Sequence, residues 1–133
     1  MSDTLTAKQQ TITLPSLAAG EIYAGILLKD GTPSHHLVLL PNDLKPSTWK
    51  QAIAWAAKQG GELPTHKEQA LLFANAAGEF EKIWYWSSEQ YAGDESAAWA
   101  QGFGNGLQYY GHKASKLRSR AVRRIPIEEQ PHD

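Results

Sequence analysis

The sequence contains no cysteine. This absence excludes disulfides, thiolate metal sites and a cysteine nucleophile, so packing alone must stabilise the fold. No apolar run approaches the roughly 20 residues that span a bilayer, and the first ten residues lack the basic start and apolar stretch of a signal peptide. The net charge of -1 gives no strong attraction to nucleic acid or an anionic membrane. We therefore expect synthesis and retention in a cytoplasm, unless the chain leaves as part of a particle.

Catalytic and metal-binding motifs are also missing. The sequence has no Gly-x-Ser-x-Gly turn, so Ser87 and Ser88 are expected to bond to backbone at a strand end rather than to act as nucleophiles. No two histidines have the i, i+4 spacing of a helical metal site, and adjacent His35 and His36 would diverge on a strand. Asp94 has one neighbouring acid, too few oxygens for calcium. We predict no enzymatic activity, no metal and no cofactor.

The length of 133 residues fits one domain. We predict flexible tails over residues 1–10 and 126–133, and a single domain over residues 11–125. A short strand is expected at Thr11–Pro15, followed by a β-hairpin. The hairpin strands lie within residues 21–28 and 36–40, and Asp30-Gly31 is the turn signal between them.

Helical periodicity follows the hairpin. A first helix is expected with Ser47 as its N-cap and Gly60-Gly61 as its stop. A second helix begins with a capping box between Thr65 and Glu68 and continues to about Gly78. The apolar spacing predicts that four side chains of these helices pack inward: Trp49, Ile53, Leu71 and Leu72.

After Phe80 the pattern changes to short, aromatic strands broken by glycine. Three are expected in "IWYWSS", "AAWAQGF" and "LQYYG", and Ser119–Ile125 is predicted as one closing strand. The order of elements is a hairpin, two helices and a glycine- and aromatic-rich β region. This order is typical of an α+β domain.

Four segments, in this order, carry a resemblance to a known family: "GGELPTHKEQALL", "YWSS", "AWAQGFGNG" and "RAVRRI". They resemble the Lcl-type C-terminal domain family, a domain of unknown function found in bacterial surface proteins and in phage and prophage genomes. "GILLKDG" and "LVLLP" look most like its phage-encoded branch. The resemblance implies a C-type-lectin-like fold, related to that of formylglycine-generating enzymes, and a role as a binding module. The calcium-binding triplets of sugar-binding lectins are missing here.

The aromatic residues divide by context. Trp86, Trp99 and Phe103 are expected in the core, because small residues on one face of a sheet need large ones on the other. Tyrosines beside glycine and polar residues have the composition of binding loops. The predicted binding surface is the outward side of the C-terminal β region: Glu89, Gln90, Tyr91, Asp94, Gln108, Tyr109, Tyr110 and His112.

Positive charge gathers between Lys113 and Arg124, without an acid in the run. The run is either a structural strand paired with acidic loops or a patch for an anionic partner. Three functional hypotheses follow: a phage virion component that recognises a host surface protein or glycan, an intracellular phage protein that binds and inhibits a bacterial host or defence protein, and, least supported, an enzyme of unknown class. Self-association as a homo-oligomer is left open.

Overall fold

A computed structural model describes residues 11–128. The predicted tail over residues 1–10 and most of the predicted C-terminal tail lie outside the described residues. The described part is α+β, with two helices and eight strands in two sheets. The strands are β1 (Ile22–Lys29), β2 (Thr32–Leu39), β3 (Leu44–Ser47), β4 (Trp84–Gln90), β5 (Ala97–Gly102), β6 (Gln108–His112), β7 (Leu117–Ser119) and β8 (Val122–Pro126); the helices are α1 (Trp49–Lys58) and α2 (His66–Ala76).

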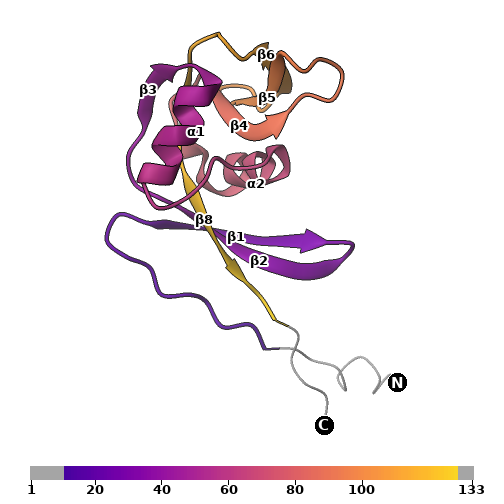
Figure 1. Ribbon diagram of the computed structural model, residues 1–133. Helices are drawn as coiled ribbons and strands as arrows, with labels where there is room; N and C mark the ends of the chain where they lie inside the picture. The colour runs from indigo at the N-terminus through magenta and orange to yellow at the C-terminus, as the bar shows by residue number, and fades with distance from the viewer. Residues whose placement is uncertain (1–10, 129–133) are drawn as a thin grey trace.

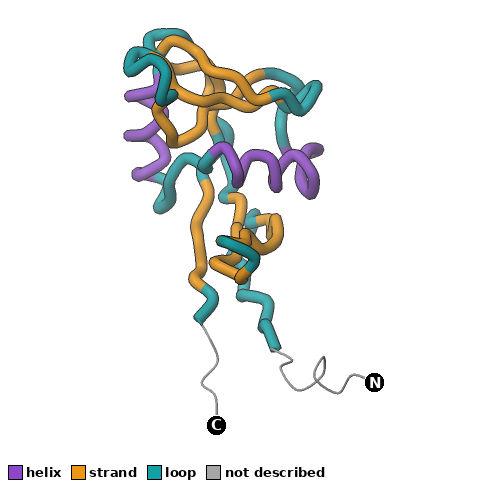
Figure 2. Tube along the Cα trace, turned by 90° about the vertical axis from the view of Figure 1, so that its right-hand side faces the viewer, coloured by secondary structure: helices purple, strands orange, loops and turns teal. Residues whose placement is uncertain are grey.

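The two sheets lie at opposite ends of the molecule (Figure 1). The three-stranded sheet has the order β1-β2-β8, and the five-stranded sheet has the order β3-β7-β4-β5-β6. Helix α2 lies between the two sheets, and α1 stands beside the five-stranded sheet; the same arrangement is visible from the side in Figure 2. The five-stranded sheet therefore has one face toward α2 and another toward α1.

The predicted hairpin is confirmed as β1 and β2. Asp30 and Gly31 both have positive φ, 51° and 81°, as a tight turn that matches the twist of the strands requires. The strand predicted at Thr11–Pro15 is wrong, because that segment has no strand pairing. Strand β8 continues to Pro126, and the Ile127 N–H then donates to the Ser34 carbonyl at 2.9 Å, so β pairing runs past residue 125.

Both predicted helices form. Thr48, and not Ser47, caps α1, because the Thr48 hydroxyl accepts the Gln51 N–H, whereas Ser47 belongs to β3. The capping box of α2 is as predicted: Thr65 accepts the Glu68 N–H at 3.1 Å, and Glu68 accepts the Thr65 N–H at 2.8 Å.

The inward faces of the helices differ in part from the prediction. Leu72 is fully buried, but Ile53 is 42% exposed. Helix α1 instead buries Ala52 and Ala56, whose small side chains bring the helix close to the sheet. Trp49 and Leu71 are half-buried and pack against the core clusters.

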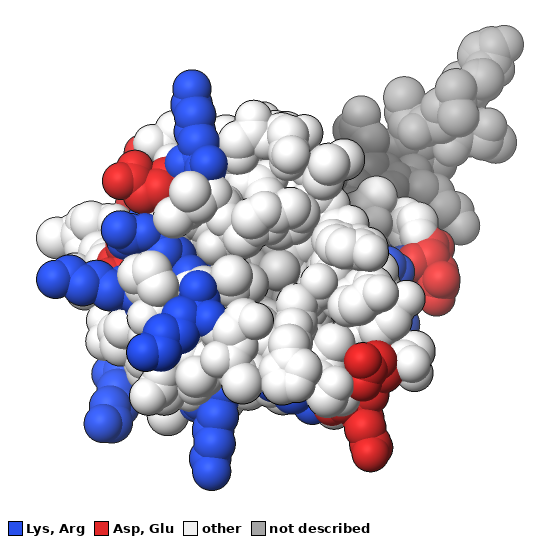
Figure 3. Space-filling model, turned by 90° about the horizontal axis from the view of Figure 1, so that it is seen from above, with Lys and Arg blue, Asp and Glu red and all other residues white. Residues whose placement is uncertain are grey.

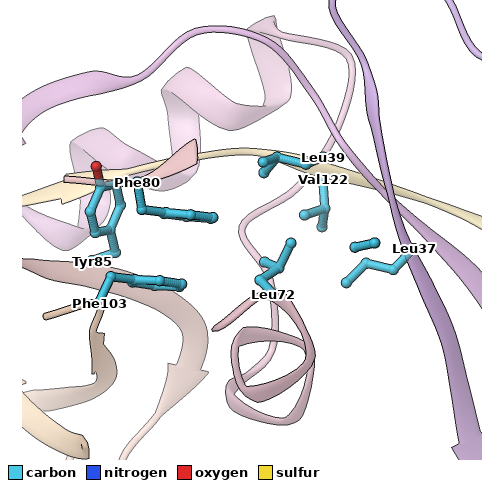
Figure 4. Close-up of a cluster of buried hydrophobic side chains, with 8 residues drawn as sticks. Leu37, Leu39, Leu72, Phe80, Tyr85, Phe103 and Val122 are labelled. Atoms are coloured by element: carbon cyan, nitrogen blue, oxygen red, sulfur yellow. The ribbon is translucent and has the colours of Figure 1, made fainter. Parts of the chain in front are cut away.

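Two hydrophobic clusters hold the layers together. One lies on the α2 side of the five-stranded sheet and reaches the hairpin (Figure 4). Its aromatic centre is the pair Phe80 and Phe103, stacked with ring centroids 3.8 Å apart, with Tyr85 edge-on to both. The second cluster joins α1 to the other face of the sheet around Trp86, which is completely buried.

The closing strand predicted over Ser119–Ile125 is two strands. Strand β7 lies in the five-stranded sheet between β3 and β4, and β8 pairs with β2 in the three-stranded sheet. Between them, the buried Arg120 donates to the carbonyls of Glu79 and Leu40 at 2.6 and 2.8 Å. The chain therefore changes sheets at Arg120-Ala121, and these bonds fix the crossing.

Candidate binding surface

The edge strand β6 carries the exposed aromatic residues of the predicted surface. Its pairing with β5 places Tyr110 opposite Trp99 and Tyr109 opposite Ala100. Tyr91, just after β4, stacks on Tyr110 with ring centroids 4.1 Å apart, and Tyr109 lies 4.5 Å from Tyr110. We call Tyr91, Tyr109 and Tyr110 the tyrosine ridge. Tyr109 is 59% exposed and Tyr110 is 37% exposed, so the ridge presents aromatic area to solvent.

The first turn of α2 supports the ridge from beneath. The His66 ring lies 5.0 Å from the Trp99 ring, and Trp99 meets Tyr91 edge-on at 5.1 Å. Glu89 accepts the His66 backbone N–H at 3.0 Å and lies 2.9 Å from its Nδ1. The Gln108 amide donates to the His66 carbonyl. Predicted residues Glu89 and Gln108 therefore converge on His66, a residue that the sequence did not suggest.

The other three predicted residues hold the loops beside the ridge. The Asp94 carboxylate accepts from the Ser96 hydroxyl and N–H at 2.7 and 2.9 Å, and these bonds lower the pKa of Asp94. Gln90 accepts from Lys113 Nζ at 2.6 Å. The His112 Nδ1 accepts the Ala114 N–H at 3.1 Å. All three side chains are exposed, so they stabilise turns while remaining accessible.

The phenols of the ridge influence one another. Tyr109 and Tyr91 both lie beside the Tyr110 ring. The neighbouring Tyr109 hydroxyl is the main cause that raises the pKa of Tyr110 above its ordinary value, with Tyr91 and Asp94 adding to it. Tyr110 is therefore neutral at ordinary pH, and its hydroxyl can act as both donor and acceptor.

Tryptophan burial corrects one prediction. Trp86 and Phe103 are core residues, as expected. Trp99 is only half-buried, because it lies on the sheet face that the first turn of α2 covers incompletely, between His66 and Tyr91. It is therefore the floor of the ridge rather than part of the main core.

A small pocket lies beside the ridge, on the sheet face that α1 covers only in part. Its volume is ≈ 280 Å³. We call it the edge pocket. Small residues at its base leave the space, and aromatic rings form its walls. It is lined by Trp84, Ala100, Tyr109, Tyr110, Gly111, Ser115 and Leu117.

A larger pocket of ≈ 450 Å³ lies near the other edge of the five-stranded sheet, around Asp43, Arg118 and Arg120. Asp43, Arg118 and Arg120 bond to other side chains of the chain or to backbone. Asp43 accepts from Arg118 at 3.0 Å and from the Tyr85 hydroxyl at 2.5 Å. Burial, followed by this contact with Asp43, raises the pKa of Tyr85 well above its usual range. The arrangement joins the residue before β3 to β4 and β7.

The basic run from Lys113 to Arg124 is mostly engaged within the chain. Arg123 binds both carboxylate oxygens of Glu21 at 2.8 Å, and Arg124 binds both of Glu68 at 2.7 and 2.8 Å. Lys113 donates to Gln90 and to the Glu95 carbonyl, and Arg118 and Arg120 make the contacts given above. These contacts favour the structural interpretation of the run.

The structure also places Ser87 and the possible metal ligands. Ser87 is buried, and its hydroxyl accepts the Glu89 N–H at 3.1 Å, a local backbone bond of the kind predicted. Among residues 11–128, no group of three or more His, Asp or Glu side chains is placed to hold a metal ion. No helix in that range is long and apolar enough to cross a membrane. The absence of metal, cofactor and catalysis stays a prediction.

No family model matches the chain, and no curated protein matches it.

Proposed function

We propose that the chain is a non-enzymatic binding module and that the tyrosine ridge is the centre of its binding surface. One observation carries the proposal: of two exposed tyrosines on an edge strand, Tyr110 stacks on Tyr91 and Tyr109 packs at a tilt against Tyr110, above a support of Trp99 and His66. Tyrosine provides a large contact area with few torsions to fix. A supported ridge loses little conformational freedom on binding, which favours affinity.

We further propose that the module has a C-type-lectin-like fold and is phage-encoded. The support is the ordered set of segments from "GGELPTHKEQALL" to "RAVRRI", which resembles the Lcl-type C-terminal domain family. On this proposal the chain is a virion component that recognises a bacterial surface protein or glycan. It is synthesised in the cytoplasm of the bacterial host.

The absence of cysteine favours a second candidate function. Proteins that work in a reducing cytoplasm have no use for disulfides. On this alternative, the chain is an intracellular phage protein that binds and inhibits a bacterial host or defence protein. Mass spectrometry of purified virions separates the two: peptides of the chain in the particle support the first, and their presence only in infected-cell lysate supports the second.

The ridge is tested by a double variant, Tyr109→Ala with Tyr110→Ala. Immobilised wild-type protein and the variant are incubated with bacterial envelope and cytosolic fractions, and the retained material is compared. We expect a bacterial protein or glycan to be retained by the wild type and lost by the variant, with a weaker dependence on salt than binding by the basic run would show. The near- and far-ultraviolet circular dichroism of the variant should match the wild type.

The competing site is the basic run, tested by Lys113→Glu with Lys116→Glu. A different set of results would assign binding to the basic run and overturn the ridge. In that case retention falls steeply with salt and disappears in this charge-reversed protein, while the tyrosine variant binds normally.

A further inference from the structure

The edge pocket is open because α1 stops short of β6. Helix α1 covers the sheet face at Trp86, and beyond it the face carries Ala100 and Gly111. A Cβ at Gly111 would lie at ordinary contact distance, 3.6 Å, from the Trp86 ring, so even a methyl group there would begin to fill the pocket floor. The pocket is therefore a consequence of small residues placed between two large ones.

The walls of the edge pocket suit one flat ring. Trp84 stands on β4 and Tyr109 on β6, with β5 between them. Two strand spacings separate the backbones of β4 and β6 by about 9.5 Å. Trp84 is also offset along the strands from Tyr109, because Trp86 is the β4 residue that pairs with Ala100, the partner of Tyr109. A planar ring placed between two aromatic walls needs about 7 Å, since each contact takes about 3.5 Å. An aromatic side chain is one planar ring thick, so it fits between the walls, and its faces match theirs.

The polar content of the pocket disfavours a sugar. Apart from the tyrosine hydroxyls and the Trp84 indole N–H, the polar side chain in its lining is Ser115. A sugar ring carries a hydroxyl on most of its carbons, and each hydroxyl that loses water without a partner costs free energy. An apolar ring requires no such partners.

Two exposed lysines are close in sequence to lining residues of the edge pocket. Lys116 stands between the lining residues Ser115 and Leu117, and Lys82 precedes Trp84 by two residues. Both lysines are exposed, and within the described residues neither takes part in an ion pair. No acidic residue lines the pocket, and Glu81 lines the other, polar pocket. Viewed from above, Lys and Arg side chains gather along one side of an uncharged central area (Figure 3).

We infer that the edge pocket receives an aromatic side chain from an acidic, extended segment of a partner protein. Strand β6 ends the five-stranded sheet, so its outer edge is open to pairing with such a segment. The ring fills the pocket, and flanking carboxylates meet Lys116 and Lys82. This inference rests on the proposed binding function and names the chemistry of the partner.

The test uses the full chain labelled with ¹⁵N and the blocked tripeptide acetyl-Glu-Phe-Glu-amide as the probe. Saturable shifts are expected at the backbone amides of Ala100, Gly111 and Leu117. Acetyl-Lys-Phe-Lys-amide should bind at least about tenfold more weakly, because two repulsive contacts replace two attractive ones. Acetyl-Glu-Ala-Glu-amide, which has no ring, should leave these amides unshifted. Methyl glucoside is tested in the same way as a representative sugar.

Matched variants locate the probe. Tyr109→Ala removes a wall and should weaken the binding of acetyl-Glu-Phe-Glu-amide by at least about tenfold. Tyr109→Phe keeps the wall and should bind this peptide as the wild type does. Lys116→Glu should weaken the binding of the same probe about fivefold. Lys29→Glu makes the same charge change in β1, at the far end of the molecule, and should have no effect.

Three patterns of probe binding would overturn the inference. They are shifts produced by methyl glucoside and not by the acidic peptide, equal binding of the acidic and basic peptides, and peptide shifts confined to residues away from the edge pocket. If none of the peptides binds while the Tyr109→Ala, Tyr110→Ala protein still loses a bacterial partner, the inference fails and the proposed function stands. If the peptide binds as expected but that double variant keeps its bacterial partner, the placement of the partner on the ridge fails.

Discussion

Glu68 and Arg124 form a two-bond ion pair between α2 and β8, with N–O distances of 2.7 and 2.8 Å. The Glu68 side chain is almost fully buried, and it also accepts from the Thr65 N–H and from His35 Nε2. Burial alone would raise its pKa, but the bonds from Arg124 and Thr65 outweigh burial and hold the pKa of Glu68 below its ordinary value. One carboxylate thus starts a helix and fastens it to the three-stranded sheet.

Replacing this carboxylate should be costly. Glu68→Ala leaves Arg124 without its buried partner and removes the capping box, so we expect a loss of about 3–5 kcal/mol in the free energy of unfolding. Urea denaturation measures the change. Glu62→Ala, which removes an exposed partner of the same arginine, is the matched control and should cost less than about 1 kcal/mol. Equal losses for the two variants would contradict the central role of Glu68.

Acid should weaken the link between the N-terminal segment and β8. Hydrogen bonds from Arg123 and from the Ala18 N–H lower the pKa of Glu21 from 4.5 to about 2. Because the folded pKa lies below the unfolded one, the stabilisation is complete above pH 4.5 and is lost as the pH falls toward 2. Urea denaturation at stepped pH should show this decline in the wild type and a shallower one in Glu21→Gln. An identical pH dependence of the free energy of unfolding in the two proteins would contradict the role of Glu21.

The two tryptophans that the sequence assigned to the core should differ in what their replacement by alanine costs. Trp86 is completely buried, so Trp86→Ala should cost about 3–5 kcal/mol. Trp99 is half-buried under the ridge, so Trp99→Ala should cost about 1–2 kcal/mol while reducing binding by the ridge. Thermal melting and the pull-down measure the two effects. A Trp99→Ala protein that melts as early as Trp86→Ala would return Trp99 to the core.

Gly61 should tolerate no side chain. A Cβ there would lie 2.3 Å from the Val122 carbonyl oxygen, within the isolated bridge between Glu62 and Val122. We expect Gly61→Ala to cost about 1–3 kcal/mol, because backbone must shift to make room. Gly78→Ala meets nothing within 4 Å and serves as the control, with an expected change under about 0.5 kcal/mol. Equal stability of the two would contradict the packing at Gly61.

Local signals explain which elements the sequence predicted. The Asp30-Gly31 turn and the Thr65–Glu68 capping box depend on neighbouring residues, and both formed as expected. Strand β3 was missed because Pro46 within it is typical of a loop, although an edge strand tolerates proline. The division of the closing segment at Arg120 depends on distant carbonyls, which a linear pattern does not contain.

The candidate site shows the same limit. Composition suggested that Tyr91, Tyr109 and Tyr110 face outward, and the Tyr110 ring contacts both of the others to form one ridge. Their contact depends on the β5–β6 register, which pairs Trp99 with Tyr110 and is set by tertiary packing. His66 was not found because its role comes from the docking of α2. Alternation does place Trp84 on the face of Trp86, and the facing Ala100 was the one available signal for the edge pocket.

The change of sheets at Arg120-Ala121 affects the order in which the chain can fold during synthesis. Strand β7 fills a position between β3 and β4, and β8 completes the sheet of β1 and β2. A ribosome that has delivered everything up to Lys116 has therefore supplied neither sheet with all its strands. The helices and the strand groups β1–β2 and β4–β5–β6 must wait, partly exposed, for residues 117–126. Residues 117–126 thus complete both sheets, and folding of this domain is expected to follow their synthesis rather than to accompany synthesis of the residues before them.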